Sequence, residues 1–168
     1  MPARPCVLDA SLLISLGKAG QVDVLSKAPS YRWHIGPITR AELRRRETRD
    51  PVERLIVQGL IAPEEVDSED PAMAAFAEWS ERVDPGEAEA IALALARGWA
   101  VGLEDLDARR LLDRLAGSGR WINCANILLD AVEARTMTLS EADGVFRRLD
   151  VYPSYQKAGV RSLSQLRP

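Results

Sequence analysis

Apolar residues along this chain fall into short continuous runs and into longer stretches with helical spacing. The short runs predict buried strands at Cys6–Leu8, Tyr31–Ile35, Trp99–Leu103 and Arg120–Cys124, and Leu60–Val66 predicts an edge strand because Pro63 interrupts it. The longer stretches predict helices at Ser11–Lys18, Val22–Ala28, Thr39 through the following arginines, Gly86–Ala96, Ala108–Ala116, Ala125–Ala134 and Ser140–Leu149. Such alternation favours a largely parallel sheet covered on both faces. We therefore predict one three-layer α/β/α domain with four or five strands.

Three Asp-Pro pairs mark further helix starts, because aspartate caps a helix well and proline fits its first position. They are Asp50-Pro51, Asp70-Pro71 and Asp84-Pro85, and each stands directly before a helical pattern. Only the stretch from Pro153 onward looks irregular. We divide the chain into a domain over residues 1–150 and a C-terminal tail over residues 151–168, with docking on a partner as one role for the tail.

Composition changes this picture little. A chain of 168 residues can bury a substantial core, and 46% hydrophobic with 28% charged residues is ordinary for a soluble globular protein. No apolar stretch resembles a signal peptide or a membrane span, so we expect a cytoplasmic protein without membrane contact. Cys6 and Cys124 lie in apolar runs and are expected to be buried and reduced. His34 is the only histidine, which leaves no Cys/His metal-ligand spacing.

Acidic residues carry most of the functional information. In open α/β sheets, ligands bind outside the carboxyl ends of the strands, so acids placed there can converge. Converging carboxylates repel one another unless a cation lies between them, and clusters of oxygen ligands suit Mg²⁺ or Mn²⁺ with a phosphate group. The sequence thus favours a metal-dependent enzyme acting on phosphates. Its candidate acids are Asp9, Glu42, Glu87, Glu89, Glu104, Asp105 and Asp107.

The first two acids differ in their structural explanation. Asp9 follows an apolar run, and Ser11 can cap the next helix in its place, which would leave the Asp9 carboxylate free. Glu42 completes a capping box with Thr39, so taken alone it has a sufficient structural role.

The next pair lies in one helix. Glu87 occupies the third helical position after Asp84, where a capping box again gives it a mainly structural role. Glu89 is the only charged residue between Glu87 and Arg97, in a helix that is apolar nearly all round. A buried carboxylate needs a cation or hydrogen-bond partners, so Glu89 is the predicted site acid.

Three acids follow the fourth strand, and at least one of them should cap the next helix. Asp107 stands directly before that helix and suits the cap, whereas Asp105 is our predicted ligand. Glu104 or Asp107 would lend a second carboxylate. His34 lies inside a strand and is assigned no chemistry.

The net charge of −3 hides a division along the chain. Residues 1–50 carry +4, residues 51–90 carry −9 and residues 91–168 carry +2. The arginines form two clusters that begin beside acids, and two interpretations stay open: a solvated helix face, or contacts to a polynucleotide backbone. The clusters are Arg40, Arg44, Arg45, Arg46 and Arg49, and Arg109, Arg110 and Arg114.

Four segments in order resemble the PIN-domain nucleases, the family that includes VapC-type toxins. Val7-Leu-Asp-Ala-Ser-Leu is similar to their first strand and acid, and Pro37-Ile-Thr-Arg-Ala-Glu-Leu to their second motif. Asp84-Pro-Gly-Glu-Ala-Glu-Ala-Ile-Ala-Leu-Ala is similar to the third motif of a subgroup that uses glutamate. The fourth motif best fits Asp105, although Gly102-Leu103 replace the residues usual before it. The resemblance covers roughly the first four-fifths of the chain.

This resemblance implies a metal-dependent endoribonuclease that cleaves single-stranded or loop RNA, with an antitoxin-like partner and a homodimer as expectations by analogy. It assigns Mg²⁺ or Mn²⁺ to Asp9, Glu42, Glu89 and Asp105, with Glu87, Glu104 and Asp107 as further candidates and Ser11 as a supporting hydroxyl. The substrate would be held by Arg40, Arg44, Arg109 and Arg110.

Two alternatives belong to other classes of protein. A PIN-like module without catalysis would bind RNA or a protein, and it predicts a folded chain without metal-stimulated cleavage. Phosphotransfer domains are disfavoured. Receivers need paired acids after the first strand and a late lysine, and haloacid-dehalogenase-type phosphatases need Asp-x-Asp. This chain has Asp9-Ala-Ser at that position and few lysines.

Overall fold

Five parallel strands form the centre of the fold in the computed structural model, which describes residues 2–167. The strands are β1 (Arg4–Leu8), β2 (Tyr31–Ile35), β3 (Ile61–Pro63), β4 (Ala100–Gly102) and β5 (Trp121–Ile122). Their order across the sheet is β3-β2-β1-β4-β5. Leu8 of β1 is in register with Ile35 on one side and Gly102 on the other. The prediction of a mostly parallel sheet within one α/β/α domain is confirmed.

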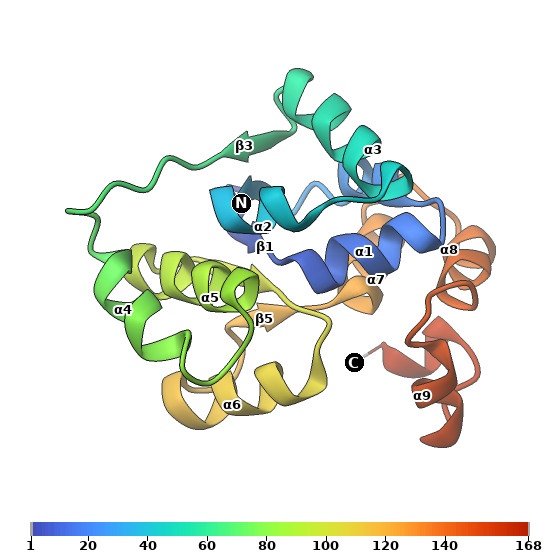
Figure 1. The fold of residues 1–168 in the computed structure, drawn as a ribbon. Helices are drawn as coiled ribbons and strands as arrows, with labels where there is room; N and C mark the ends of the chain where they lie inside the picture. The colour runs from blue at the N-terminus through green and yellow to red at the C-terminus, as the bar shows by residue number, and fades with distance from the viewer. Residues whose placement is uncertain (1, 168) are drawn as a thin grey trace.

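Helices cover both faces of this sheet (Figure 1). Because side chains alternate across a strand, Cys6 and Leu8 enter one hydrophobic core and Val7 enters the other. The first core contains residues of α1 (Ala10–Lys18), the 3-10 helix η1 (Val22–Lys27), α3 (Arg46–Val57), α7 (Cys124–Glu133) and α8 (Leu139–Phe146). The second contains residues of α4 (Ala72–Trp79), α5 (Pro85–Arg97) and α6 (Leu106–Ala116). Strand β1 is therefore buried on both faces.

The strand order reverses at β1. From β1 the chain adds β2 and β3 on one side, then returns to place β4 and β5 on the other. A crevice opens at such a point outside the carboxyl ends of the strands, and ligands bind there in open α/β sheets. Asp9 extends the β1–β4 pairing, since its N–H donates to the carbonyl oxygen of Gly102 at 2.9 Å.

The helix predicted from Thr39 through the arginines is wrong, because the chain forms two helices there. The first, α2 (Pro37–Glu42), ends where Leu43 leaves helical geometry at ψ 72°, and α3 follows. Pro51 lies inside α3, so Asp50-Pro51 does not start a helix. Proline cannot donate to the carbonyl of Glu47, which lies in an exposed turn where water can bind it. The other two pairs precede α4 and α5 as predicted.

The expectation of an irregular C-terminal stretch is also wrong. It forms α9 (Tyr152–Lys157) and the 3-10 helix η2 (Leu163–Leu166). The Tyr155 hydroxyl accepts a hydrogen bond from the Asn123 side chain at 2.9 Å, its ring packs edge-on against Phe146, and Leu163 is fully buried. This segment therefore docks on its own domain.

Other predictions concern single residues. Cys6 and Cys124 are buried free thiols, as expected, and burial raises the pKa of both. His34 packs on the ring of Trp99 and its Nδ1 lies 2.7 Å from a carboxylate oxygen of Glu64, which fits a packed histidine. Across residues 2–167, the structure contains no helix whose length and apolar character would let it cross a membrane.

Candidate functional site

Asp9 lies at the carboxyl end of β1 and caps α1. Its Oδ2 accepts hydrogen bonds from the N–H of Ser11 at 2.8 Å and from the Ser11 hydroxyl. Its Oδ1 is buried and has no hydrogen-bond partner among the described residues. Ser11 thus does not replace Asp9 as the cap but binds its carboxylate. Burial is the main cause that raises the pKa of Asp9, and the Ser11 bonds act in the opposite direction.

Glu104 lies at the end of the neighbouring strand β4 and shares the same condition. Only 5% of its surface is exposed, and its Oε2 accepts a hydrogen bond from the N–H of Cys124 at 2.9 Å. Its Oε1 is buried without a partner in the described part of the chain. The Glu104 N–H donates to the Ser11 hydroxyl oxygen at 3.2 Å. Ser11 therefore connects the two buried carboxylate residues.

Asp105, rather than Asp107, caps α6. Its Oδ1 accepts a hydrogen bond from the N–H of Ala108 at 2.8 Å. The expectation that Asp107 would be the cap is wrong, because its side chain is 91% exposed and its carboxylate lies 3.6 Å from Arg110. Capping uses one carboxylate oxygen of Asp105 and leaves the other, so its ligand role stays a prediction.

Glu87 faces the other acids from the first turn of α5. It is half-buried, and burial is the main cause that raises its pKa to about 7. The negative charges of Asp9, Asp105 and Asp84 raise it further. Two of these residues belong to the strand ends described above, so the structure brings Glu87 to the same crevice.

Glu42 approaches α5 from α2. Its Oε1 accepts a hydrogen bond from the N–H of Gly86 at 3.1 Å. The predicted capping box with Thr39 does not form, because Gly36 is the cap of α2 and the Thr39 hydroxyl donates to the Gly86 carbonyl at 3.3 Å. The carboxylate of Glu42 is close enough to Asp9 to raise its pKa slightly.

Glu89 uses both carboxylate oxygens to hold α2. Oε1 accepts from the N–H of Ile38 and Oε2 from the N–H of Thr39, each at 2.9 Å. Burial raises the pKa of Glu89, and these two bonds lower it. The buried charge thus has the hydrogen-bond partners it needs without a cation. The ligand role predicted for Glu89 stays a prediction that its contacts do not favour.

The carboxylates fit a divalent cation by chemistry, although not as a preformed cage. Within residues 2–167, no three His, Cys, Asp or Glu side chains are grouped so that they could hold a metal ion as they stand. The crevice nevertheless offers only oxygen ligands, and two of them, Asp9 Oδ1 and Glu104 Oε1, are buried without partners. Such ligands suit Mg²⁺ or Mn²⁺. Binding would require rotation of one or more side chains.

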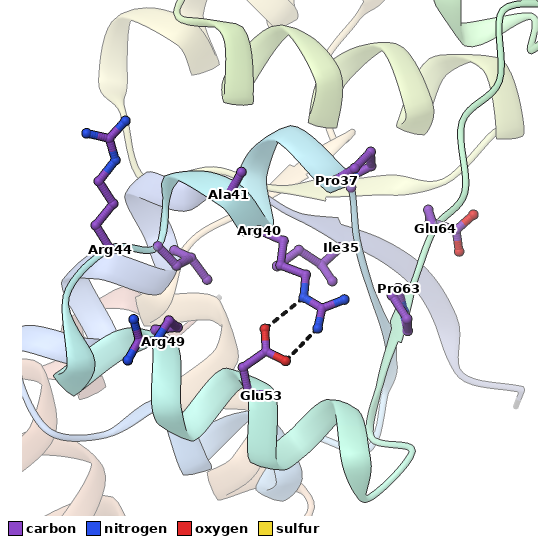
Figure 2. A pocket seen from close by; sticks show the side chains of 11 residues that line it. Ile35, Pro37, Arg40, Ala41, Arg44, Arg49, Glu53, Pro63 and Glu64 are labelled. Atoms are coloured by element: carbon purple, nitrogen blue, oxygen red, sulfur yellow. Dashed lines mark hydrogen bonds and ion pairs between the residues drawn. The ribbon is translucent and has the colours of Figure 1, made fainter.

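Most of the predicted substrate-binding arginines have other partners. Figure 2 shows Arg40 of α2 paired with Glu53 of α3. The two guanidinium–carboxylate distances are 2.7 and 2.6 Å, and both residues line a cavity of about 550 Å³. Arg109 lies over the ring of Trp121 at 4.8 Å, and Arg110 pairs with Asp107. Arg44 is exposed and forms no ion pair with any described residue. The four contacts predicted to RNA remain untested.

Two other arginines share a cleft with the acids. A cavity of about 460 Å³ lies between the start of α5 and α6, and its walls include Glu87, Asp105, Arg82 and Arg114. Both arginines are exposed, and no carboxylate of residues 2–167 lies within ion-pair distance of them. Arg82 is not among the predicted substrate contacts, because it lies outside both arginine clusters in the most acidic part of the chain. No sequence signal marks it.

Comparison with known families decides the relationship. The model of a family described as a PIN domain, DUF3368, matches residues 5–154. This chain belongs to the PIN-domain family. The match covers β2 to β5, all but the first residue of β1, and all the predicted site acids of this PIN domain. It confirms the resemblance to PIN domains. PIN domains are typically nucleases that use divalent metal ions, which is the coarse activity the family indicates. A search among curated proteins finds no match.

Proposed function

We propose that this PIN domain is a divalent-metal-dependent endoribonuclease that cleaves single-stranded or loop RNA. One observation carries the proposal: at the reversal of strand order, two buried carboxylates each keep an oxygen without a partner among residues 2–167. An unpartnered buried polar atom costs free energy, so its presence at a ligand-binding crevice calls for a functional reason. A hard cation supplies that reason.

Five acids near the reversal of strand order are proposed to hold the metal. Asp9 and Asp105 lie near enough to Glu87 for their charges to act on it, and Glu42 approaches from α2. Glu104 presents a buried oxygen after the neighbouring strand β4. A divalent cation bound there would activate a water molecule and neutralise charge on the scissile phosphate. Ser11 keeps the Asp9 carboxylate oriented by donating from both its N–H and its hydroxyl.

Substrate contacts are proposed for the cleft between α5 and α6. Arg82 and Arg114 lie beside two of the carboxylate residues and have no competing ion pair in the described structure. Guanidinium groups bind phosphate in a bidentate manner, so two unpaired arginines fit the backbone on either side of a cleavage point. The choice of RNA over DNA rests on the resemblance to VapC-type toxins. An antitoxin-like partner and a homodimer are proposed on the same analogy.

A binding module without catalysis is the second candidate. The observation in its favour is the lack of a ready three-ligand group among residues 2–167. Such a module would keep the arginines of the cleft and bind RNA without cutting it. The two candidates make opposite predictions for metal-stimulated cleavage.

The deciding experiment measures cleavage of a mixed set of transfer RNA and structured RNA by the purified chain with Mn²⁺, Mg²⁺ or EDTA. An Asp9→Asn variant is the control. Cutting that requires metal and disappears in the variant supports the nuclease. If both proteins bind RNA but neither cuts, and calorimetry detects no metal binding, the binding module replaces it.

A further inference from the structure

We infer that Glu89 and Gly86 are positioning residues that set the distance between α2 and α5, and thereby place Glu42 and Glu87 at the metal site. This inference rests on the proposed function, because it concerns the same site. Its structural basis is a pair of reciprocal contacts between the two helices. Glu89 of α5 holds the start of α2, and Glu42 at the end of α2 holds the start of α5. We call these contacts the α2–α5 clamp.

The first step concerns the short helix. Helix α2 has six residues, too few to be stable alone, and no side chain within it caps its start. Its first free N–H groups are instead bound by Glu89, whose two oxygens take the amides of Ile38 and Thr39. The position of α2 therefore depends on α5.

The clamp leaves no room for a side chain at two glycines. A Cβ atom on Gly86 would lie 2.3 Å from Oε2 of Glu42, and one on Gly36 would lie 2.2 Å from Oε2 of Glu89. Gly36 has φ −80° and ψ 159°, values that any residue adopts, so this glycine is required for room and not for backbone freedom. Each carboxylate of the clamp thus rests directly against a glycine.

The clamp lies next to the proposed metal site. Glu87 follows Gly86 in α5, so the N–H bound by Glu42 stands one residue from the acid that faces Asp9 and Asp105. If α2 shifts, the carboxylate of Glu42 moves away from the crevice although no proposed ligand has been removed. Glu89 would then act through Glu42 and not by touching the metal.

Gly86→Ala tests this directly, because it keeps every carboxylate and adds only a methyl group against Glu42. Alanine is a better helix former than glycine, so the added methyl is expected to act mainly through its contact with Glu42. Titration calorimetry with Mn²⁺ should show at least ~10-fold weaker binding than wild type, as for partners that orient metal ligands. Gly144→Ala is the matched control, since a Cβ there meets nothing within 4 Å in α8, and it should bind as wild type.

A double-variant comparison separates positioning from a general disturbance. In a Glu42→Ala background the added methyl has no carboxylate to displace, so Gly86→Ala should weaken Mn²⁺ binding no further. The same loss in both backgrounds, or wild-type affinity in Gly86→Ala alone, would overturn the inference.

Hydrogen exchange in EDTA tests the clamp even if the wild type binds no Mn²⁺, an outcome that would count against the proposed function alone. Glu89→Gln should speed exchange at the Gly86 amide, which Glu89 does not touch, because α2 loosens and Glu42 leaves. The Ala108 amide, held by Asp105, should be unchanged. If exchange rises only at Ile38 and Thr39, the two ends of the clamp are independent and the inference fails.

Discussion

Two groups of buried carboxylates near the carboxyl end of β1 differ in whether their oxygens have hydrogen-bond partners. In the α2–α5 clamp, each oxygen of Glu89 has a backbone N–H at 2.9 Å, and nearby Arg40 is matched by Glu53. At the β1–β4 crevice, Asp9 and Glu104 each keep a buried oxygen without a partner among residues 2–167. Both regions contain buried carboxylates, yet only the first satisfies them from within the protein.

Hydrogen-bond satisfaction of the carboxylate oxygens therefore distinguishes structural acids from candidate functional acids better than burial does. A buried carboxylate whose two oxygens are both hydrogen-bonded gains little further from a ligand. A buried carboxylate without hydrogen-bond partners lowers the stability of the folded state. A bound cation restores that stability. The arginines differ in the same way, since Arg40 pairs with Glu53, whereas Arg82 and Arg114 form no ion pair within residues 2–167.

The largest expected effect comes from Asp9→Asn. It should reduce Mn²⁺ affinity and any RNA cleavage by at least ~100-fold, more than the loss of an outer partner of a ligand. Its melting temperature in EDTA should stay equal or rise, because asparagine still caps α1 and a buried charge is gone. Calorimetry and thermal melts check both parts. A clear loss of stability in EDTA would contradict the comparison.

Glu89→Gln should lower stability in EDTA, in contrast to Asp9→Asn. The amide group of glutamine turns a donor toward a backbone N–H, so one buried amide loses its acceptor at a cost of about 1–3 kcal/mol. Urea unfolding in EDTA measures this change. If Glu89→Gln is neutral while Asp9→Asn is destabilising, the satisfied and unsatisfied regions have been assigned the wrong way round.

The arginines of the cleft between α5 and α6 extend the comparison to RNA binding. Arg82→Ala with Arg114→Ala should weaken binding of a short single-stranded RNA in the Asp9→Asn background. It should also lower the slope of log affinity against log salt by about 1.4, or about 0.7 for each lost phosphate contact. Arg40→Ala with Arg49→Ala removes the same charge from ion-paired residues and should leave the slope unchanged. Equal slopes for both pairs would reject the cleft as the RNA site.

A further prediction concerns pH. Glu87 has its pKa raised from 4.5 to about 7, so the folded state holds a proton that the unfolded state has lost. Stability in EDTA should therefore fall as pH rises from 4.5 to about 7 and level off above, since linkage gives a negative slope there. Glu87→Gln should flatten this dependence. Saturating Mn²⁺ should oppose the fall, because the cation binds the ionised carboxylate. Melting curves across this range measure both.

Local patterns determined most of the architecture in advance. Apolar runs located all five strands, and two of the three Asp-Pro pairs marked helix starts. Pro51 failed as a marker because its missing hydrogen bond falls in an exposed turn that tolerates it. The prediction of an irregular C-terminal stretch failed because aromatic contacts to Phe146 and the hydrogen bond from Asn123 stabilise short helices there. The composition of the stretch does not favour these helices.

The sequence by itself determined which acids are available and that several lie at strand ends. Only the tertiary structure decided their roles. Glu87 and Glu89 are two residues apart and point about 200° apart around α5, so one faces Asp9 and the other faces α2. The amides that satisfy Glu89 lie 50 and 51 residues away along the chain. A carboxylate's role depends on which groups fold against each of its oxygens, and those partners are brought together by packing and not by local pattern.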